Sequence, residues 1–173
     1  MEKIKWGIIG PGNIANNFAD GLKVSYSGQL VSIASKSEDR RKNFGDKYDI
    51  HPDFRFDSYE DIINSEHIDA IYISTPHTLH AQWTIKAAGK GKHILCEKPG
   101  AINFNEGKKI IDAVREAGVF YMEGFMYRCH PQIPKLVDII KNKIIGDVIS
   151  VETSFGFDMG KTIPDHRLFN KNL

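Results

Sequence analysis

Residues 4–15 read Ile-Lys-Trp-Gly-Ile-Ile-Gly-Pro-Gly-Asn-Ile-Ala, and this stretch decides the fold that the sequence predicts. An apolar run typical of a buried strand leads into a glycine turn, and the turn leads into the start of a helix. Gly10 permits a sharp turn, and Gly12 lets a pyrophosphate approach the backbone. Ala15 stands where a third small residue allows the helix to pack closely on the strand. Backbone N–H groups and the positive end of the helix dipole then point at one spot, which suits a phosphate.

The same stretch supplies the first cofactor-binding candidates. They are Gly10, Gly12, Asn13, Ile14 and Ala15. A glycine pattern of this kind is weak evidence by itself, and an ordinary glycine turn is the alternative. Its place after an apolar run, at the start of a long alternation of strands and helices, favours the dinucleotide interpretation.

The composition is that of a globular protein. Of its residues, 41% are hydrophobic and 26% are charged. A chain of 173 residues with this composition is long enough to form a complete core. Lys and Arg number 23 against 22 Asp and Glu, and this balance favours neither a nucleic-acid groove nor a polybasic membrane surface. The sequence has no apolar run of membrane-spanning length and no signal-peptide pattern, so we expect a cytoplasmic protein without a membrane partner.

Cysteine and histidine spacing predicts no metal centre. Cys96 and Cys129 lack the spacing of a disulfide or metal framework, and we expect both to be small buried hydrophobes. No cluster of His, Cys and Asp has the spacing of metal ligands, and no Ser-His-Asp arrangement is evident.

Strand and helix patterns alternate over residues 1–122. Beyond the first strand, the predicted strands cover residues 29–35, 69–74, 93–97 and 119–122, with room for a minor strand in 51–56. The predicted helices cover residues 13–23, 38–48 with Ser37 as its cap, a segment that starts at 58–63, 79–88 and 104–117. This alternation predicts parallel strands joined by right-handed crossovers. With the opening glycine turn, it indicates an α/β protein with a doubly wound parallel sheet of the Rossmann type.

Ligands of a doubly wound sheet sit outside the carboxyl ends of its strands. We therefore expect the functional residues directly after the strands, at 10–15, 35–40, 74–80 and 97–99.

The pattern changes near residue 123. A helix is predicted over 133–143 and an exposed-face strand over 147–157, followed by an irregular segment. One helix and one strand cannot close a sheet. We interpret residues 123–173 as the incomplete start of a second domain, in a chain that is a fragment or that borrows a partner's sheet.

Four segments together resemble the Gfo/Idh/MocA oxidoreductases, the family of glucose–fructose oxidoreductase, inositol dehydrogenase and dihydrodiol dehydrogenase. The segments are Gly10–Ala15, Ser74–His80, Glu97–Pro99 and Glu123–Pro131. The resemblance implies NAD(P)-dependent hydride transfer on the hydroxyl or ketone of a sugar, cyclitol or diol. It also implies that 123–173 begin an α+β substrate and oligomerisation domain, whose glycine-rich catalytic segment would follow residue 173.

Lys98 is the candidate catalytic residue. A carbonyl that is being reduced develops negative charge on its oxygen, and a nearby ammonium stabilises that charge or helps to deliver a proton. Glu97 either orients Lys98 or contacts the cofactor ribose, and the resemblance suggests a cis Lys98–Pro99 bond. The alternative is a surface lysine in a loop.

Ser35 bears on the choice between NAD and NADP. It ends the second predicted strand about 25 residues beyond Gly10, where NAD enzymes usually carry an acid for the ribose 2′-hydroxyl. A hydroxyl followed by basic residues suits a 2′-phosphate instead, with Lys36 or Arg40 as its partner. We therefore predict NADP as the preferred cofactor and NAD as the alternative. The other interpretation is that Arg40 and Arg41 are solvated helix residues and that the enzyme does not discriminate between the two cofactors.

More cofactor contacts are expected after the strand that ends at residue 74. Ser74, Thr75 and Pro76 would lie near the pyrophosphate or the nicotinamide ribose. His77 and His80 would line the same mouth, although a histidine at a helix start is often only a cap or a surface group.

The candidates beyond residue 123 are weaker. Tyr127, Arg128 and His130 are substrate candidates. Arg128 could instead form an interdomain ion pair, and His130 could simply pack before Pro131. Arg167 is a cofactor candidate because relatives carry a Trp-Arg pair where this chain has His166 before Arg167.

The sequence as a whole predicts an NADP-preferring oxidoreductase for a small carbohydrate-like substrate, with a homo-oligomer built through the C-terminal sheet of the complete protein. Two alternatives stay open. One is a non-catalytic NAD(P)-binding protein, and the other is an inactive truncated piece of such an enzyme.

Overall fold

The structure is a computed structural model that describes residues 2–156 and residue 158. The chain divides into two units, Met1–Phe125 and Met126–Leu173. The assignment of the second part to a substrate domain stays a prediction.

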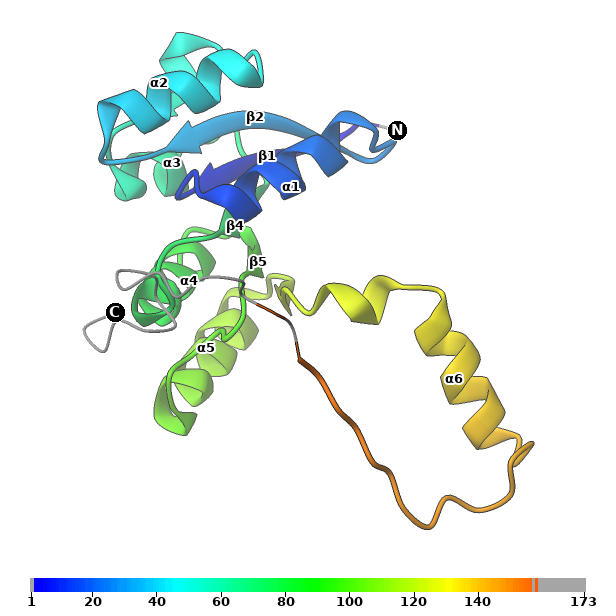
Figure 1. The fold of residues 1–173 in the computed structure, drawn as a ribbon. Helices are drawn as coiled ribbons and strands as arrows, with labels where there is room; N and C mark the ends of the chain where they lie inside the picture. Colours follow the sequence, from blue (N-terminus) through cyan, green and yellow to red (C-terminus); the bar gives the residue numbers. More distant parts are fainter. Residues whose placement is uncertain (1, 157, 159–173) are drawn as a thin grey trace. The chain divides into compact units, whose positions relative to one another are not determined.

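The first unit is built on a six-stranded sheet in the order β3-β2-β1-β4-β5-β6 (Figure 1). The strands are β1 (Ile4–Ile9), β2 (Gly28–Ala34), β3 (Arg55–Phe56), β4 (Ala70–Ile73), β5 (His93–Cys96) and β6 (Tyr121–Glu123). Every neighbouring pair is parallel. The chain builds outward from β1 first to one side and then to the other, so the predicted doubly wound fold is confirmed.

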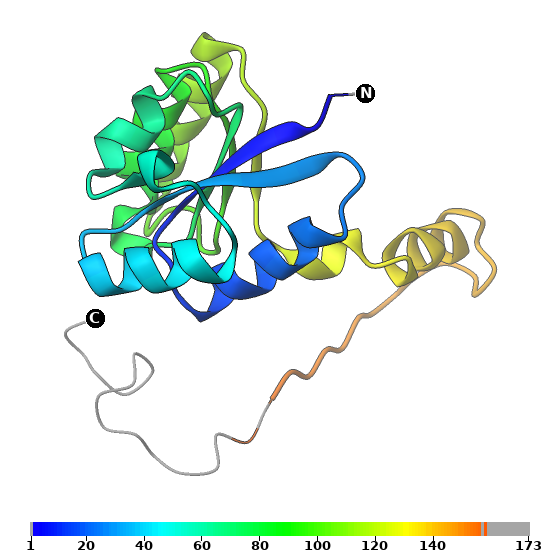
Figure 2. The same cartoon turned by 90° about the horizontal axis from the view of Figure 1, so that it is seen from above.

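Helices connect consecutive strands and cover both faces of the sheet. They are α1 (Asn13–Lys23), α2 (Glu38–Lys47), α3 (Tyr59–Asn64), α4 (His80–Ala88) and α5 (Phe104–Ala117), with short 3-10 helices η1 (Pro52–Phe54) and η2 (His77–Leu79). Figure 2 shows α1 and α2 on one side of the sheet and the green helices, α3 to α5, on the other.

Two apolar clusters fill the two faces, and the strands supply side chains to both. Ile8 and Tyr72 pack with α1 and α2, whereas Ile9, Ile71 and Ile73 pack with α3, α4 and α5. Successive side chains of a strand point to opposite faces, so β1 and β4 must be apolar at nearly every position. That requirement explains the continuous apolar runs of the sequence.

Most predicted elements are confirmed within two residues of their ends. The helices over 13–23 and 104–117 begin and end as predicted, and the minor strand is β3. The Ser37 hydroxyl caps α2 by accepting a hydrogen bond from the Arg40 N–H at 3.4 Å.

The second unit contains η3 (Met126–Cys129) and α6 (Gln132–Lys141). The strand predicted over 147–157 is wrong for residues 147–156, which form neither helix nor strand, and Phe157 lies outside the described residues. A strand needs a neighbour for its backbone hydrogen bonds, and no described segment pairs with this one. The expectation of two buried cysteines is half right: Cys96 is buried, but Cys129 is exposed in a unit whose described helices bury no residue.

None of the described helices has both the length and the apolar character that a membrane span requires.

Replacing Ile71 with Ala should lower the free energy of unfolding by about 2–5 kcal/mol, because it leaves a cavity at a fully buried position. Urea unfolding followed by circular dichroism measures this change. Val24→Ala is the control, since Val24 is 78% exposed and its loss should cost about 0.5 kcal/mol or less. Equal effects of the two substitutions would contradict the assignment of Ile71 to the core.

Candidate functional site

The turn between β1 and α1 is shaped by two glycines with different constraints. Gly10 has a φ of +89°, and a Cβ there would lie 3.1 Å from the Ser74 carbonyl oxygen. Any larger residue would therefore be strained and would press on the backbone after β4. A Cβ at Gly12 would have nothing within 4 Å, so this part of the turn is open to a ligand.

The first turn of α1 presents backbone donors without a competing side chain. Gly12 is the N-cap, no side chain caps the helix, and the first turn carries no acidic residue. The first N–H groups of a helix lack intrahelical partners, and the helix dipole places partial positive charge there. Ala15 is fully buried where α1 lies close to the sheet. The geometry of this turn suits a phosphate group, and its contact with the cofactor's pyrophosphate stays a prediction.

Ser74 and Thr75 follow β4 and lie next to the glycine turn. The Ser74 hydroxyl donates to the Gly10 carbonyl oxygen at 2.7 Å, which joins the two loops. Thr75 is 8% exposed, and its Oγ1 has no hydrogen-bond partner in the described part of the chain. A buried hydroxyl without a partner is costly. β1 and β4 also flank the point where the strand order reverses, which is where doubly wound sheets bind ligands.

The carboxyl end of β2 carries the residues proposed for the 2′-phosphate. Ser35 is buried and its hydroxyl accepts from the Ser37 N–H at 3.3 Å, while the side chains of Lys36 and Arg40 are exposed. The sequence offered Arg41 only as a solvated helix residue, but it is partly buried and its guanidinium donates to the Ser35 carbonyl oxygen at 2.7 Å. The available signal was the pair Arg40-Arg41 at the start of a helix. Adjacent helical residues point in different directions, so the two side chains do not share one environment.

The loop after β5 holds the candidate catalytic residue. Lys98 is exposed, and the Lys98–Pro99 bond is cis, as the resemblance implied. Glu97 does not bond to Lys98 within the described chain; its Oε1 accepts a hydrogen bond from the Tyr72 hydroxyl at 2.7 Å. Burial, together with the Glu97 carboxylate, raises the pKa of Tyr72 well above its usual value, so this phenol stays a donor.

His80 lies inside the protein and joins two loops. It is 1% exposed, with Nδ1 2.8 Å from the Pro99 carbonyl oxygen and Nε2 2.8 Å from the Thr75 carbonyl oxygen. Both ring nitrogens thus face backbone oxygens inside the protein, and a direct cofactor contact of His80 stays a prediction. His77 is half-buried at the start of η2, and Pro76 before it is exposed.

Glu123 at the end of β6 is a second residue that sequence reasoning missed. Its Oε1 accepts a hydrogen bond from the Gly100 N–H at 2.7 Å, so the carboxylate fixes the end of the loop after β5. A Cβ at Gly100 would collide with the Tyr121 hydroxyl. The signal was present in the Glu-Gly pair that opens the fourth family segment.

The weaker candidates belong to the second unit. Tyr127, Arg128 and His130 lie in or directly after η3 and are exposed. Their role toward a substrate stays a prediction, and Arg167 lies outside the described residues.

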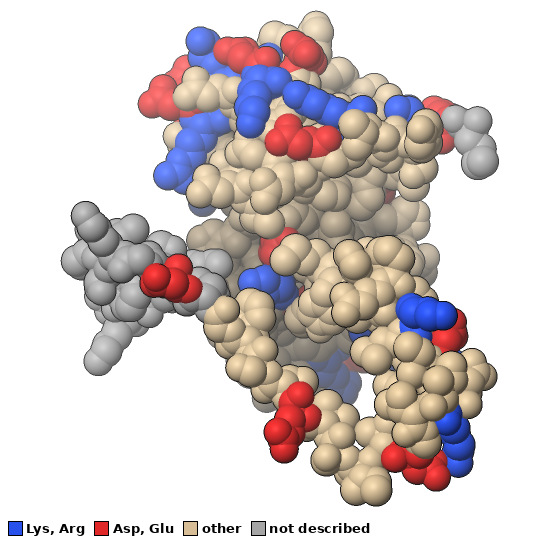
Figure 3. All heavy atoms as spheres, turned by 45° about the vertical axis from the view of Figure 1, so that its right-hand side comes forward, with Lys and Arg blue, Asp and Glu red and all other residues tan. Residues whose placement is uncertain are grey.

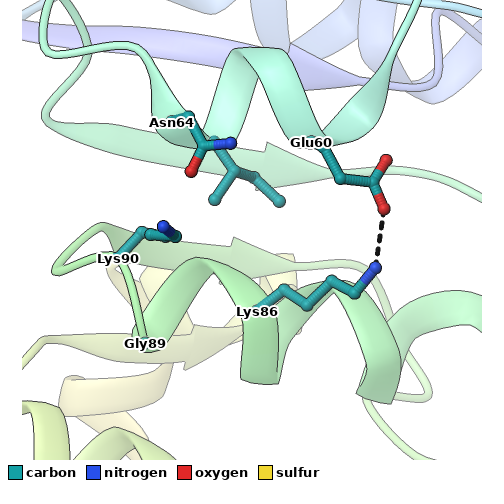
Figure 4. Close-up of a pocket in the computed structure, with 6 residues that line it drawn as sticks. Glu60, Asn64, Lys86, Gly89 and Lys90 are labelled. Atoms are coloured by element: carbon teal, nitrogen blue, oxygen red, sulfur yellow. Dashed lines mark hydrogen bonds and ion pairs between the residues drawn. The ribbon is translucent and has the colours of Figure 1, made fainter.

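Charged side chains of both signs are mixed around α2 in the upper part of Figure 3. Asp46 pairs there with Arg55, and the hydrogen bond from Arg55 is the main reason that the pKa of Asp46 is lowered. A shallow hollow between α3 and α4 also carries an ion pair, between Lys86 and Glu60 at 2.6 Å (Figure 4). Its lining includes Asn64 and Gly89 at the carboxyl ends of α3 and α4, which is the edge of the sheet away from the glycine turn.

The family model described as an oxidoreductase family with an NAD-binding Rossmann fold, Gfo/Idh/MocA, matches residues 4–125. The chain belongs to this family.

Two similar curated members of the family are named as dehydrogenases of a diol and of a sugar. Trans-1,2-dihydrobenzene-1,2-diol dehydrogenase of Xenopus tropicalis is 33% identical over 91% of this chain and 48% of its own length. D-xylose 1-dehydrogenase (NADP(+)) 2 of Haloferax volcanii is 32% identical over 94% of this chain and 49% of its own length. The chain spans about half the length of the curated relatives that it matches.

A solved structure with the same fold contains the cofactor. The 3-ketoreductase KijD10 from Actinomadura kijaniata, in complex with NADP, has a TM-score of 0.75 and 31% sequence identity to this chain. The match covers 84% of this chain and 46% of that chain.

Alanine at the two glycines should separate folding from binding. Gly10→Ala forces a Cβ onto a left-handed backbone and against Ser74, and should lower the free energy of unfolding by about 1–3 kcal/mol. Gly12→Ala meets no atom and should leave the melting temperature nearly unchanged, but its methyl group obstructs the approach of a pyrophosphate. Thermal melts and titration with NADPH measure the two effects. Normal NADPH affinity in Gly12→Ala would contradict this placement of the pyrophosphate.

Proposed function

We propose that this chain is the cofactor-binding part of an NADP-preferring oxidoreductase that transfers hydride between the nicotinamide and a carbinol or ketone carbon of a sugar, cyclitol or diol. The observation that carries the proposal is the uncapped, acid-free first turn of α1 beside the reversal of strand order. The unpartnered Thr75 hydroxyl at the same place supports it. The names of the diol and xylose dehydrogenases above support the substrate class.

The pyrophosphate of the cofactor has a proposed contact at the start of α1. The nicotinamide cofactor supplies or accepts the hydride when bound. Gly12 and the first turn of α1 would hold the pyrophosphate, because their N–H groups and the helix dipole attract negative charge. Ser74 keeps the loop after β4 beside that turn through its bond to Gly10.

The end of β2 supports NADP over NAD. Ser35 stands there in place of an acid, whose charge would repel a 2′-phosphate. The exposed cations of Lys36 and Arg40 follow it, and a guanidinium can bind a phosphate through two parallel hydrogen bonds. The NADP in the KijD10 structure and the NADP of the Haloferax enzyme's name agree with this choice.

Lys98 is the proposed catalytic group of the loop after β5. Its ammonium would stabilise the negative charge that develops on the substrate oxygen during reduction, or would deliver a proton to it. Three polar contacts hold the loop in place. They join Tyr72 to Glu97, His80 to Pro99 and Glu123 to Gly100.

The proposal also covers the binding partner, the oligomeric state and the cellular location of the protein. Its partner would be a small carbohydrate-like molecule, since the near-neutral net charge offers no field for a nucleic acid. We propose a cytoplasmic homo-oligomer joined through the sheet of the C-terminal domain, as the family resemblance implies.

The chain should bind NADPH more tightly than NADH, and Arg40→Ala should weaken NADPH binding about tenfold while it leaves NADH binding unchanged. Isothermal titration calorimetry measures both affinities. Lys42→Ala is the matched control, because it removes one positive charge from the same helix at a residue that pairs with Asp46. Tighter binding of NADH than of NADPH would overturn the NADP assignment.

Lys98→Met should leave the NADPH affinity within about threefold of that of the unsubstituted protein. It should lower the rate of carbonyl reduction by a factor of about 10²–10⁴. Stopped-flow absorbance at the NADPH band measures hydride transfer in the protein that carries the whole catalytic site. Lys90→Met is the control, since Lys90 lies just after α4, at the end of the sheet away from the loop that carries Lys98. A nearly unchanged rate in Lys98→Met would remove Lys98 from the mechanism.

A further inference from the structure

Tyr72 is a polar residue inside the cluster between the sheet and α1. It lies on β4, is 2% exposed, and its ring centroid is 4.1 Å from that of Phe18 in α1. Phe18 in turn packs edge-on against Trp6 of β1 at 5.2 Å. This packing fixes the plane of the Tyr72 ring, and therefore the place of its hydroxyl.

The Tyr72 hydroxyl reaches the loop that carries the candidate catalytic residue. Leu95 of β5 is the register partner of Tyr72, and Glu97 lies two residues further along on the same face. The carboxylate of Glu97 therefore turns toward α1 and meets the Tyr72 hydroxyl at 2.7 Å.

Glu97 keeps one oxygen free for a ligand. Its Oε1 takes the Tyr72 hydrogen bond, and its Oε2 makes no hydrogen bond in the described part of the chain. Gly124 lies beside it, and a Cβ there would stand 3.2 Å from Oε1. Glycine at this position leaves the carboxylate uncrowded and able to accept a second donor.

The position of Glu97 in the sheet indicates which half of the cofactor it meets. In a doubly wound sheet each half binds one mononucleotide, on either side of the reversal of strand order. Ser35, Lys36 and Arg40 follow β2 on the adenosine side, whereas Glu97 follows β5 on the other side.

We propose that Tyr72 is a positioning residue that fixes the Glu97 carboxylate so that Oε2 accepts a hydrogen bond from a ribose hydroxyl in the nicotinamide half of the cofactor. This inference rests on the proposed function and assigns a role that the family motif alone does not give to Tyr72. Through Phe18 the same ring packs on the helix proposed to bind the pyrophosphate, so one buried tyrosine contacts both parts of the site.

The test compares two ligands. NADPH carries the nicotinamide ribose, and adenosine 2′,5′-bisphosphate carries only the adenosine half. Tyr72→Phe keeps the packed ring and removes the hydroxyl, so it should weaken NADPH binding about threefold to tenfold and leave the bisphosphate affinity within about 1.5-fold. Glu97→Ala should show the same selective loss, and adding Tyr72→Phe to Glu97→Ala should cause no further loss. Titration calorimetry on the four chains gives these affinities.

Tyr48→Phe is the matched control. Tyr48 belongs to the same cluster, is 8% exposed, and its hydroxyl also bonds to side chains, those of Asn16 and Asp20. Its loss should not change the ratio of the two affinities. If Tyr72→Phe lowered the affinities for both ligands equally, Tyr72 would have a structural role only. If Tyr72→Phe lowered NADPH affinity as much in the Glu97→Ala background as in the unsubstituted chain, Tyr72 would not act through Glu97. Either result overturns the inference. Failure of the unsubstituted chain to bind NADPH or NADH would instead overturn the proposed function, and this inference with it.

Discussion

The pairing of β1 with β2 on one side and β4 on the other is the constraint on which the rest of the structure depends. It brings the ends of β1 and β4 together, so that Gly10 stands against the backbone of Ser74 with no space for a Cβ. The closeness of these two loops creates the point where the strand order reverses. A phosphate at the start of α1 and groups after β4 can reach the same ligand only because these strands are neighbours.

The two halves of the sheet are built differently around that point. After β2, the side chains of Lys36 and Arg40 are exposed, and solvated cations can adjust to a charged group that arrives. After β5, the loop is held by hydrogen bonds with the side chains of Tyr72, His80 and Glu123, which belong to β4, α4 and β6. Fixed donors and acceptors lose little entropy when a ligand binds, and a reaction that needs an accurate approach of two carbon atoms benefits from such preorganisation.

Local sequence patterns predicted the elements and their order, because glycine turns, helix caps and apolar periodicity act within a few residues of the chain. The pattern could not predict the bond between Tyr72 and Glu97, which depends on the register of β4 against β5 over 25 residues. Nor could it show that both ring nitrogens of His80 face backbone oxygens inside the protein. The strand predicted over 147–157 failed at 147–156 for the related reason that alternation describes one strand, while strand formation needs a partner.

The tyrosine at position 72 shows how a residue can serve the core and the site together. β4 is covered on both faces, so every side chain of this strand must be compatible with a buried position. A phenylalanine would meet that requirement equally well, and the hydroxyl adds a polar atom that must find a partner in the interior. Glu97 is that partner, and its carboxylate is thereby kept on the α1 side of the loop. The demand that buried polar groups be satisfied therefore orients a group that the apolar packing of the sheet alone would leave free to turn into solvent.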